Sequence, residues 1–101
     1  MKYSVVFRVE ARDEALAAAE YIAEHASPEV AGRWYEALEA AIKSLATMPR
    51  RCPLAREHGS LAGVELRQLV VHSHRLIFTI RASEVHVLHV RHAACENFGE
   101  P

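Results

Sequence analysis

The residues of this chain that could do chemistry are concentrated in its second half. Seven arginines and six of the seven histidines lie between Met48 and Pro101, together with five acidic residues. The planar guanidinium of arginine is suited to binding carboxylates and phosphates. Histidine exchanges protons near neutral pH because its unperturbed pKa is about 6.5. This composition predicts recognition of an anionic group, with histidine available for acid–base chemistry.

Four side chains are the main candidates, because each lies in or next to an apolar, alternating run. They are Arg67, Arg75, Arg91 and His92. Each also has a purely structural interpretation. Arg75 could flank a strand and pair with Glu65 or with the helices, and the other two arginines could form ion pairs on a sheet surface. The histidine could make a structural hydrogen bond at the end of a strand.

The histidines and cysteines give weaker signals. His72 and His74 share one parity, as do His86 and His92, whereas His89 takes the opposite face from the second pair. A metal site needs three or four convergent ligands, and no Asp or Cys stands at ligand spacing beside these histidines. We therefore predict neither a metal nor a cofactor.

The two cysteines, Cys52 and Cys95, share no motif spacing, so they indicate neither a disulfide framework nor a zinc site. Cys52 is expected to be an inert small residue.

Length and composition indicate one domain over residues 1–101. Half of the residues are hydrophobic, the formal net charge is −1 and the pI is about 6.6, so the overall charge does not indicate a nucleic-acid-binding protein. The first ten residues read as a strand rather than as a signal sequence. No apolar run approaches the roughly 20 residues that a membrane span needs. The cytoplasm is the expected compartment, with no membrane partner.

Three short apolar runs between Val64 and His92 alternate with polar residues and have the period of β-strands. The breaks at 72–74 and 81–84 are short enough for hairpins, which predicts a three-stranded antiparallel meander. Alternation on the middle strand separates two faces. One face carries Leu76, Phe78 and Ile80, and the other carries Arg75, Ile77, Thr79 and Arg81.

The remaining elements complete an α+β fold. Tyr3–Val9 reads as a strand that must pair with the meander to give a four-stranded sheet. Residues 13 to about 26 and 28 to about 47 are helical in pattern, with Ser27 as the cap of the second helix, and they predict a helical hairpin that covers one face of the sheet. The long connection Pro49–Gly63, which contains Arg50 and Arg51, is either a plain surface loop or a loop that contacts a partner. The tail from 93 to 101 shows no sustained pattern.

This order of elements resembles the RelE/ParE superfamily of type II toxin–antitoxin toxins over nearly the whole chain. An arginine entering one strand and the V-L-H-V-R-H close of the last strand are similar to ParE-like members. The stretches that carry the resemblance are YSVVF with Glu10-Ala11, Tyr21-Ile22-Ala23, Ala31-Gly32-Arg33-Trp34, Leu45 through Pro49, PRRCPL with Glu57, and above all ELRQLVV, HRLIFTI and VHVLHVRHAA.

The resemblance implies a small sheet flanked by a helical hairpin, and a cognate antitoxin that wraps and neutralises the toxin. It leaves two activities open. RelE-like members cut mRNA in the ribosome, whereas ParE-like members inhibit DNA gyrase without chemistry. A member that has lost toxicity is a third possibility, and a higher-order toxin–antitoxin oligomer is compatible with all three.

Two departures from the RNA-cleaving pattern favour the binding inhibitor. The family's Arg-His-Gly-x-Arg ending reads Arg91-His92-Ala93-Ala94-Cys95 here, so that a cysteine stands where an arginine is expected. Only Asn97 and Phe98 follow where such members carry a tyrosine. We therefore predict a gyrase-type inhibitor, with a ribosome-dependent mRNA endoribonuclease as the alternative. The candidates for catalysis are His92, Arg75 and Arg91, and those for binding are Arg67, Arg75, Arg91, Arg50 and Arg51.

Overall fold

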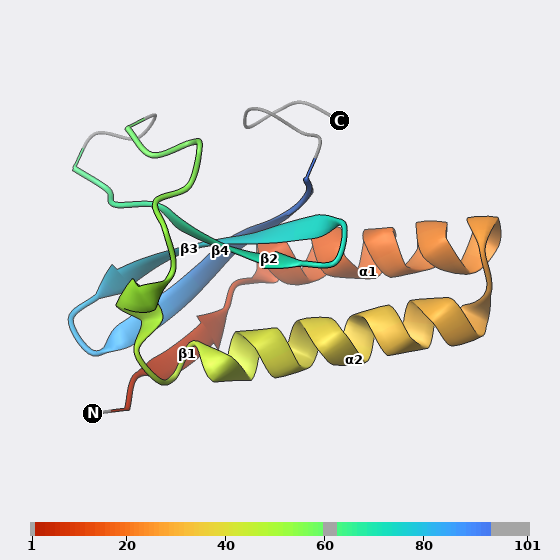
Figure 1. The fold of residues 1–101 in the computed structure, drawn as a ribbon, viewed down its shortest axis with the longest axis horizontal. Coiled ribbons are helices and arrows are strands. Elements are labelled where there is room, and N and C mark those ends of the chain that lie inside the picture. Colours follow the sequence, from red (N-terminus) through yellow and green to blue (C-terminus); the bar gives the residue numbers. More distant parts are fainter. Residues whose placement is uncertain (1, 60–62, 94–101) are drawn as a thin grey trace.

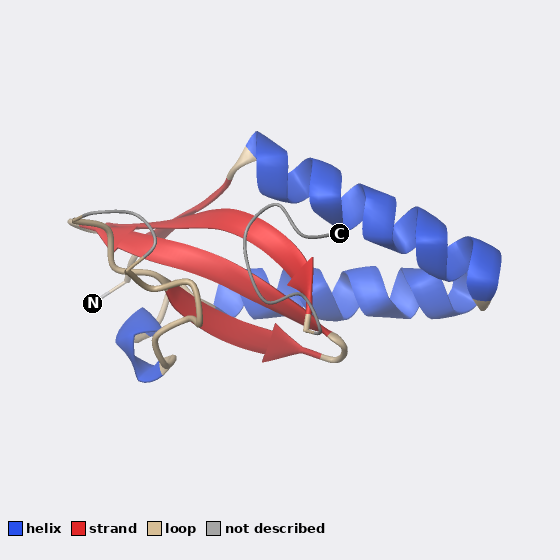
Figure 2. Ribbon diagram, turned by 90° about the horizontal axis from the view of Figure 1, so that it is seen from above, coloured by secondary structure: helices blue, strands red, loops and turns tan. Residues whose placement is uncertain are grey.

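A four-stranded mixed sheet, covered on one face by two helices, forms the body of the molecule (Figures 1 and 2). The computed structural model describes residues 2–59 and 63–93. The strands run in the spatial order β1-β4-β3-β2. The predicted α+β fold is therefore confirmed. Its strands are β1 (Ser4–Phe7), β2 (Arg67–Val71), β3 (His74–Arg81) and β4 (Glu84–His92).

The N-terminal strand pairs with the meander as predicted, and it does so in parallel with β4 at one edge of the sheet. The register runs from Ser4 opposite Glu84 to Phe7 opposite Val87. The strand is shorter than the expected Tyr3–Val9, because the paired register ends at Val87, next to an irregularity in β4.

The two helices are α1 (Val9–His25) and α2 (Pro28–Ser44). The first helix begins four residues earlier than its alanine-rich pattern predicts, and the second ends before the expected residue 47. The predicted cap is confirmed, since Ser27 Oγ accepts a hydrogen bond from the backbone N–H of Val30 at 3.1 Å. The hairpin end of the helices projects past the strands (Figures 1 and 2).

The main core lies between the helices and one face of the sheet. The predicted separation of faces on β3 is confirmed, because Leu76 and Phe78 join the core with the helices, whereas Ile77 joins a smaller cluster on the other face. The helices contribute large side chains to the main core, among them Trp34, Leu38 and Ile42.

A β-bulge in β4 changes which side chains share a face. Ile77 pairs with His89 and the next residue, Phe78, pairs with Val87, so Leu88 is the extra residue. Because of the bulge, three valines that do not follow strict alternation along β4 all face the main core, namely Val85, Val87 and Val90.

The long connection before β2 folds back onto the second face of the sheet. It begins with a short 3₁₀ turn, Pro49–Arg51. The backbone N–H of Ala55 donates to Leu66 O at 2.8 Å, and the N–H of Gln68 donates to Pro53 O at 3.0 Å. Ala55 and Leu66 then pack on Ile77 in the smaller cluster. This connection is thus part of the packed structure over much of its length.

Cys95, Asn97 and Phe98, where the sequence departs from the RNA-cleaving pattern, lie outside the described residues. Across 2–59 and 63–93, neither helix has the length and hydropathy to cross a membrane.

Candidate functional site

The register of β3 and β4 places Arg75 and Arg91 opposite one another, on the face of the sheet that points away from the helices. Arg75 Nη1 donates to Glu57 Oε1 at 2.9 Å and Nη2 donates to Oε2 at 2.7 Å. Nη1 also donates to Gln68 Oε1 at 2.9 Å. Both partners of the ion pair are 2% exposed, so the guanidinium faces the protein interior rather than a partner.

The structural interpretation of Arg75 was right in kind but wrong in its partner. Glu57, from the long loop, takes the place expected for Glu65, which instead pairs with Arg67. Hydrogen bonds from Arg75 hold the pKa of Glu57 below its usual value, and they outweigh the opposing effect of burial. The carboxylate is therefore charged near neutral pH, as a two-point ion pair requires.

Arg91 belongs to a second cluster, which is centred on Glu14 of α1. Glu14 Oε1 accepts hydrogen bonds from the backbone N–H of Val90 at 3.0 Å and from the ring of His89 at 3.1 Å. Glu14 Oε2 lies 3.4 Å from Nε of Arg91. Burial alone would raise the pKa of Glu14, but these contacts together hold it below its usual value. The carboxylate thus closes the edge of β4 where β1 has ended. Sequence reasoning missed Glu14, because nothing in an alanine-rich helix marks one glutamate as an edge partner.

Arg67 fastens the loop to the start of β2. Its Nη1 donates to Cys52 O at 2.6 Å and to Arg50 O at 3.3 Å, while Nε donates to Glu65 Oε1 at 2.9 Å. Arg67 therefore shares its donors between a carboxylate and the carbonyl groups of Arg50 and Cys52, in and just after the turn at Pro49–Arg51.

The adjacent loop arginines differ sharply in their surroundings. Arg51 Nη1 donates to Ser44 O, the last residue of α2, at 3.4 Å, and to Thr47 O at 2.7 Å and Met48 O at 3.1 Å just past the helix. A cation is favourable there because the last carbonyl groups of a helix carry partial negative charge. Both arginines are exposed, but the side chain of Arg50 makes only one long contact, from Nη1 to Tyr3 Oη at 3.4 Å, among the described residues. Of the predicted binding arginines, Arg50 has the side chain best placed to meet another molecule.

The remaining catalytic candidate, His92, lies on the other face of the sheet. It pairs with His74, and their ring centroids are 5.2 Å apart in an edge arrangement. The ring of His74 in turn packs 4.9 Å from that of Trp34, in the main core. Burial and the neighbouring His92 lower the pKa of His74, which favours its neutral form. His92 and Arg91 are adjacent in a strand and so point to opposite faces.

The three predicted catalytic residues therefore have different neighbours within the described parts of the chain. Arg75 meets Glu57, Arg91 meets Glu14, and His92 meets His74. The arginines share a face, but the histidine is not on it.

Comparison with known proteins adds the family. A family model described as the ParE toxin of the type II toxin–antitoxin system parDE matches residues 5–95. The chain belongs to the ParE toxin family. This agrees with the RelE/ParE resemblance seen in the sequence. A search of curated proteins gave no significant match.

The fold of this ParE-family toxin also matches a solved structure described as a chromosomal ParDE toxin–antitoxin system from P. aeruginosa. The TM-score is 0.74 and the identity is 17%, over 90% of this chain and 96% of the other. At this identity the likeness concerns the fold.

The histidines and Cys52 of this ParE-family toxin do not form a metal centre within the described residues. The bulge at Leu88 corrects the expected parity, because His86 and His89 share the outer face and His92 does not. Cys52 is buried, and burial raises the pKa of its thiol. A raised thiol pKa disfavours the reactive thiolate.

Proposed function

We propose that this ParE-family toxin acts by binding and inhibiting a target such as DNA gyrase, without performing chemistry, and that a cognate antitoxin neutralises it in the cytoplasm. The observation that carries the proposal is the position of His92 on the opposite face of the sheet from Arg75 and Arg91. A proton-transferring group must lie within hydrogen-bond reach of the group that the cations hold. In this fold the sheet itself lies between the histidine that could transfer a proton and the two arginines that could hold an anion.

The endoribonuclease alternative would use the outer face, where Arg75 and Arg91 are neighbours. Each of these arginines already meets a protein carboxylate, Glu57 or Glu14. A phosphate would have to replace a charged partner that the fold itself supplies, and in the Arg75 pair that partner is buried. Such an exchange opposes binding, because removing one member of a buried ion pair leaves an uncompensated charge.

The antitoxin is the second part of the proposal. The arginines on the sheet predict that its segment lies across the sheet and the long loop, with carboxylates on Arg67, Arg75 and Arg91. That placement stays a prediction, as does a higher-order toxin–antitoxin oligomer. The folded loop favours contact at its exposed rim, where Arg50 and Arg56 lie, over contact with the buried Arg75.

The proposal is tested by expressing the chain from a tightly controlled promoter and following two processes in the same culture. Plasmid supercoiling should fall before the rate of translation does. His92→Ala should leave growth arrest intact, whereas Arg50→Ala should weaken it by a modest step, because single solvated charge contacts contribute only about 0–1 kcal/mol.

The opposite pattern would reverse the assignment. Loss of a general acid–base group typically lowers the rate ~10²–10⁴-fold. If translation failed first and His92→Ala abolished the arrest at equal protein level, the endoribonuclease would be the correct function.

A further inference from the structure

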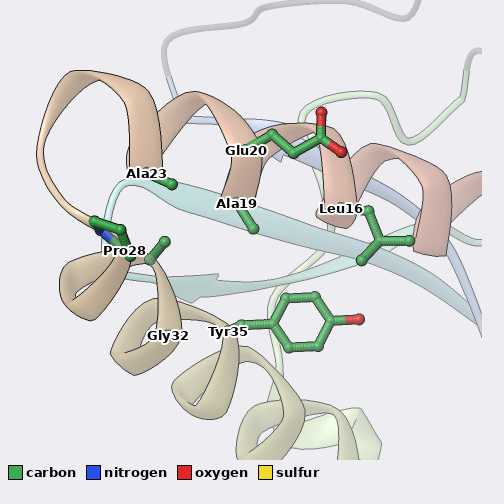
Figure 3. Close-up of a pocket in the computed structure, with 8 residues that line it drawn as sticks. Leu16, Ala19, Glu20, Ala23, Pro28, Gly32 and Tyr35 are labelled. Atoms are coloured by element: carbon green, nitrogen blue, oxygen red, sulfur yellow. The ribbon is translucent and has the colours of Figure 1, made fainter.

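A pocket of about 350 Å³ lies between the end of the helical hairpin and the turn that joins β2 to β3. It shares no described residue with the groove between α1 and α2 that Figure 3 shows. Ligand-binding pockets have a volume of this order and combine apolar walls with a few polar groups. The lining here does the same, with three apolar residues and three polar ones: Ile22, Val30 and Trp34, and Arg33, His72 and Ser73.

The polar side chains of the pocket favour an anion. All three can donate a hydrogen bond, and none is acidic. Arg33 is exposed, and within residues 2–59 and 63–93 it forms no ion pair. The hairpin as a whole has the opposite charge, with eight acidic residues and three basic ones between Val9 and Ser44. The pocket departs from this balance, because its charged side chain is a guanidinium, which suits a carboxylate or a phosphate.

A buried donor in the wall of the same pocket lacks an acceptor. Trp34 is 5% exposed, and its indole Nε1 has no hydrogen-bond partner among the described residues. The ring of His74 packs edge-on against the indole, with 4.9 Å between the centroids, but it does not accept from this nitrogen. Buried polar groups in folded proteins are rarely left unpaired. Because Trp34 lines the pocket, an acceptor bound there would account for the unpaired donor.

We propose that this pocket binds a small organic acid, in which one carboxylate is attached to an apolar body about the size of a phenyl ring. Arg33 holds the carboxylate at the exposed side of the pocket, with His72 beside it. The apolar body packs against Trp34, Ile22 and Val30. A single arginine matches a singly charged carboxylate better than a doubly charged phosphate, and the apolar walls favour a ligand with a hydrophobic part. The proposal does not depend on which target the toxin inhibits.

The experiment uses the full-length chain and three small molecules that separate the two parts of the proposed ligand. Phenylacetate carries both parts, phenylacetamide has the same shape without the charge, and acetate lacks the ring. Trp34 is the only tryptophan of the chain, so a saturable change in its fluorescence measures binding beside it. Phenylacetate should bind at least about 10-fold more tightly than either of the other two, because each of them lacks one of the two contacts.

Matched variants locate the binding. Arg33→Met removes the guanidinium, keeps an unbranched side chain and should weaken phenylacetate at least about 10-fold. Lys43→Met removes a cation at an exposed position of the same helix outside the lining, and it should leave Kd unchanged. Val30→Phe narrows the pocket without changing its charge and should also weaken binding. Thermal unfolding checks that the variants fold, and Arg33→Met, at an exposed position, is decisive if Val30→Phe does not.

Four outcomes would overturn the proposal. The absence of a saturable change with phenylacetate would remove the pocket as a site for organic acids, and equal affinity for phenylacetate and phenylacetamide would remove the charge argument. Equal Kd values for Arg33→Met and Lys43→Met would place the ligand elsewhere. A short acetylated peptide that ends in phenylalanine offers the same carboxylate and ring on a polypeptide. Tighter binding of this peptide than of phenylacetate would assign the pocket to the chain terminus of a partner protein.

Discussion

Arg75 and Glu57 form a two-point ion pair that holds the long loop on the outer face of the sheet. The guanidinium nitrogens lie 2.9 and 2.7 Å from the two carboxylate oxygens, and both side chains are 2% exposed. Desolvation of two charges offsets much of the attraction between them, so the pair adds little net stability compared with apolar side chains. Its effect is to fix where the loop lies, because either charge alone would be buried without a partner.

Glu57→Ala should therefore lower the free energy of unfolding by about 3–5 kcal/mol. The double variant Glu57→Leu with Arg75→Met should lose much less, since both charges are gone. Denaturant titrations of the wild type, both single variants and the double variant measure the coupling. If the double variant lost as much stability as the two single variants combined, the pair would not act as a unit.

Glu14→Ala should open the edge of β4 next to the bulge. The Val90 N–H loses its acceptor, and His89 and Arg91 lose the carboxylate that they share. Amide hydrogen exchange of Val90 should accelerate, while that of Leu76, in the centre of the sheet, should change less. Glu10→Ala, at an exposed position of the same helix, is the control. Equal protection of Val90 in both variants would contradict the edge role.

His74 should make stability depend on pH in the neutral range. Its pKa in the folded chain lies below the ordinary value of 6.5, so the unfolded chain takes up the proton first as the pH falls. The free energy of unfolding should therefore decrease as the pH falls through 6.5 toward the pKa of the folded state. The groups that face the ring are Trp34, Ser73 and His92. His74→Phe should flatten the slope between pH 7.5 and 5.5, and an unchanged slope would assign the effect to another group.

Arg50 and Arg51 are adjacent, but their substitution by alanine should affect different properties, toxicity for Arg50 and stability for Arg51. Arg51→Ala removes the hydrogen bond to Ser44 O at the end of α2 and those to Thr47 O and Met48 O just after it, and should lower the free energy of unfolding by about 1 kcal/mol. Arg50→Ala should change it by less than about 0.5 kcal/mol, because the side chain is exposed and its contact with Tyr3 Oη is long, at 3.4 Å. Only Arg50→Ala should weaken toxicity at equal protein stability. Thermal melts beside growth curves separate the two effects, and a stable Arg51→Ala variant would contradict the helix-end role.

Local patterns in the sequence were enough to predict the elements and their order. Period-2 alternation marks the strands because side chains alternate across a sheet, and Ser27-Pro28 marks the start of α2 through capping chemistry. The limits of β1 and α1 were less predictable. They depend on where β4 can accept a parallel neighbour, which is a property of a segment about eighty residues away in the sequence.

The bulge at Leu88 was likewise not predicted from the sequence. The irregular spacing of Val85, Val87 and Val90 was a signal for an extra residue, because strict alternation cannot place all three on one face. Strict alternation, which ignores the extra residue, assigned His86, His89 and His92 to the wrong faces of the sheet.

By itself, the sequence determined the fold class, the family and the residue types available for binding, since these follow from patterns within short stretches. Only the tertiary structure decided which charges are enclosed. Glu57 and Arg75 are 18 residues apart, and Glu14 and Val90 are 76 residues apart. Ion pairing depends on distance and burial in space, and neither can be read from residue type. The partner of a guanidinium was therefore decided by the way the loop and α1 close on the sheet.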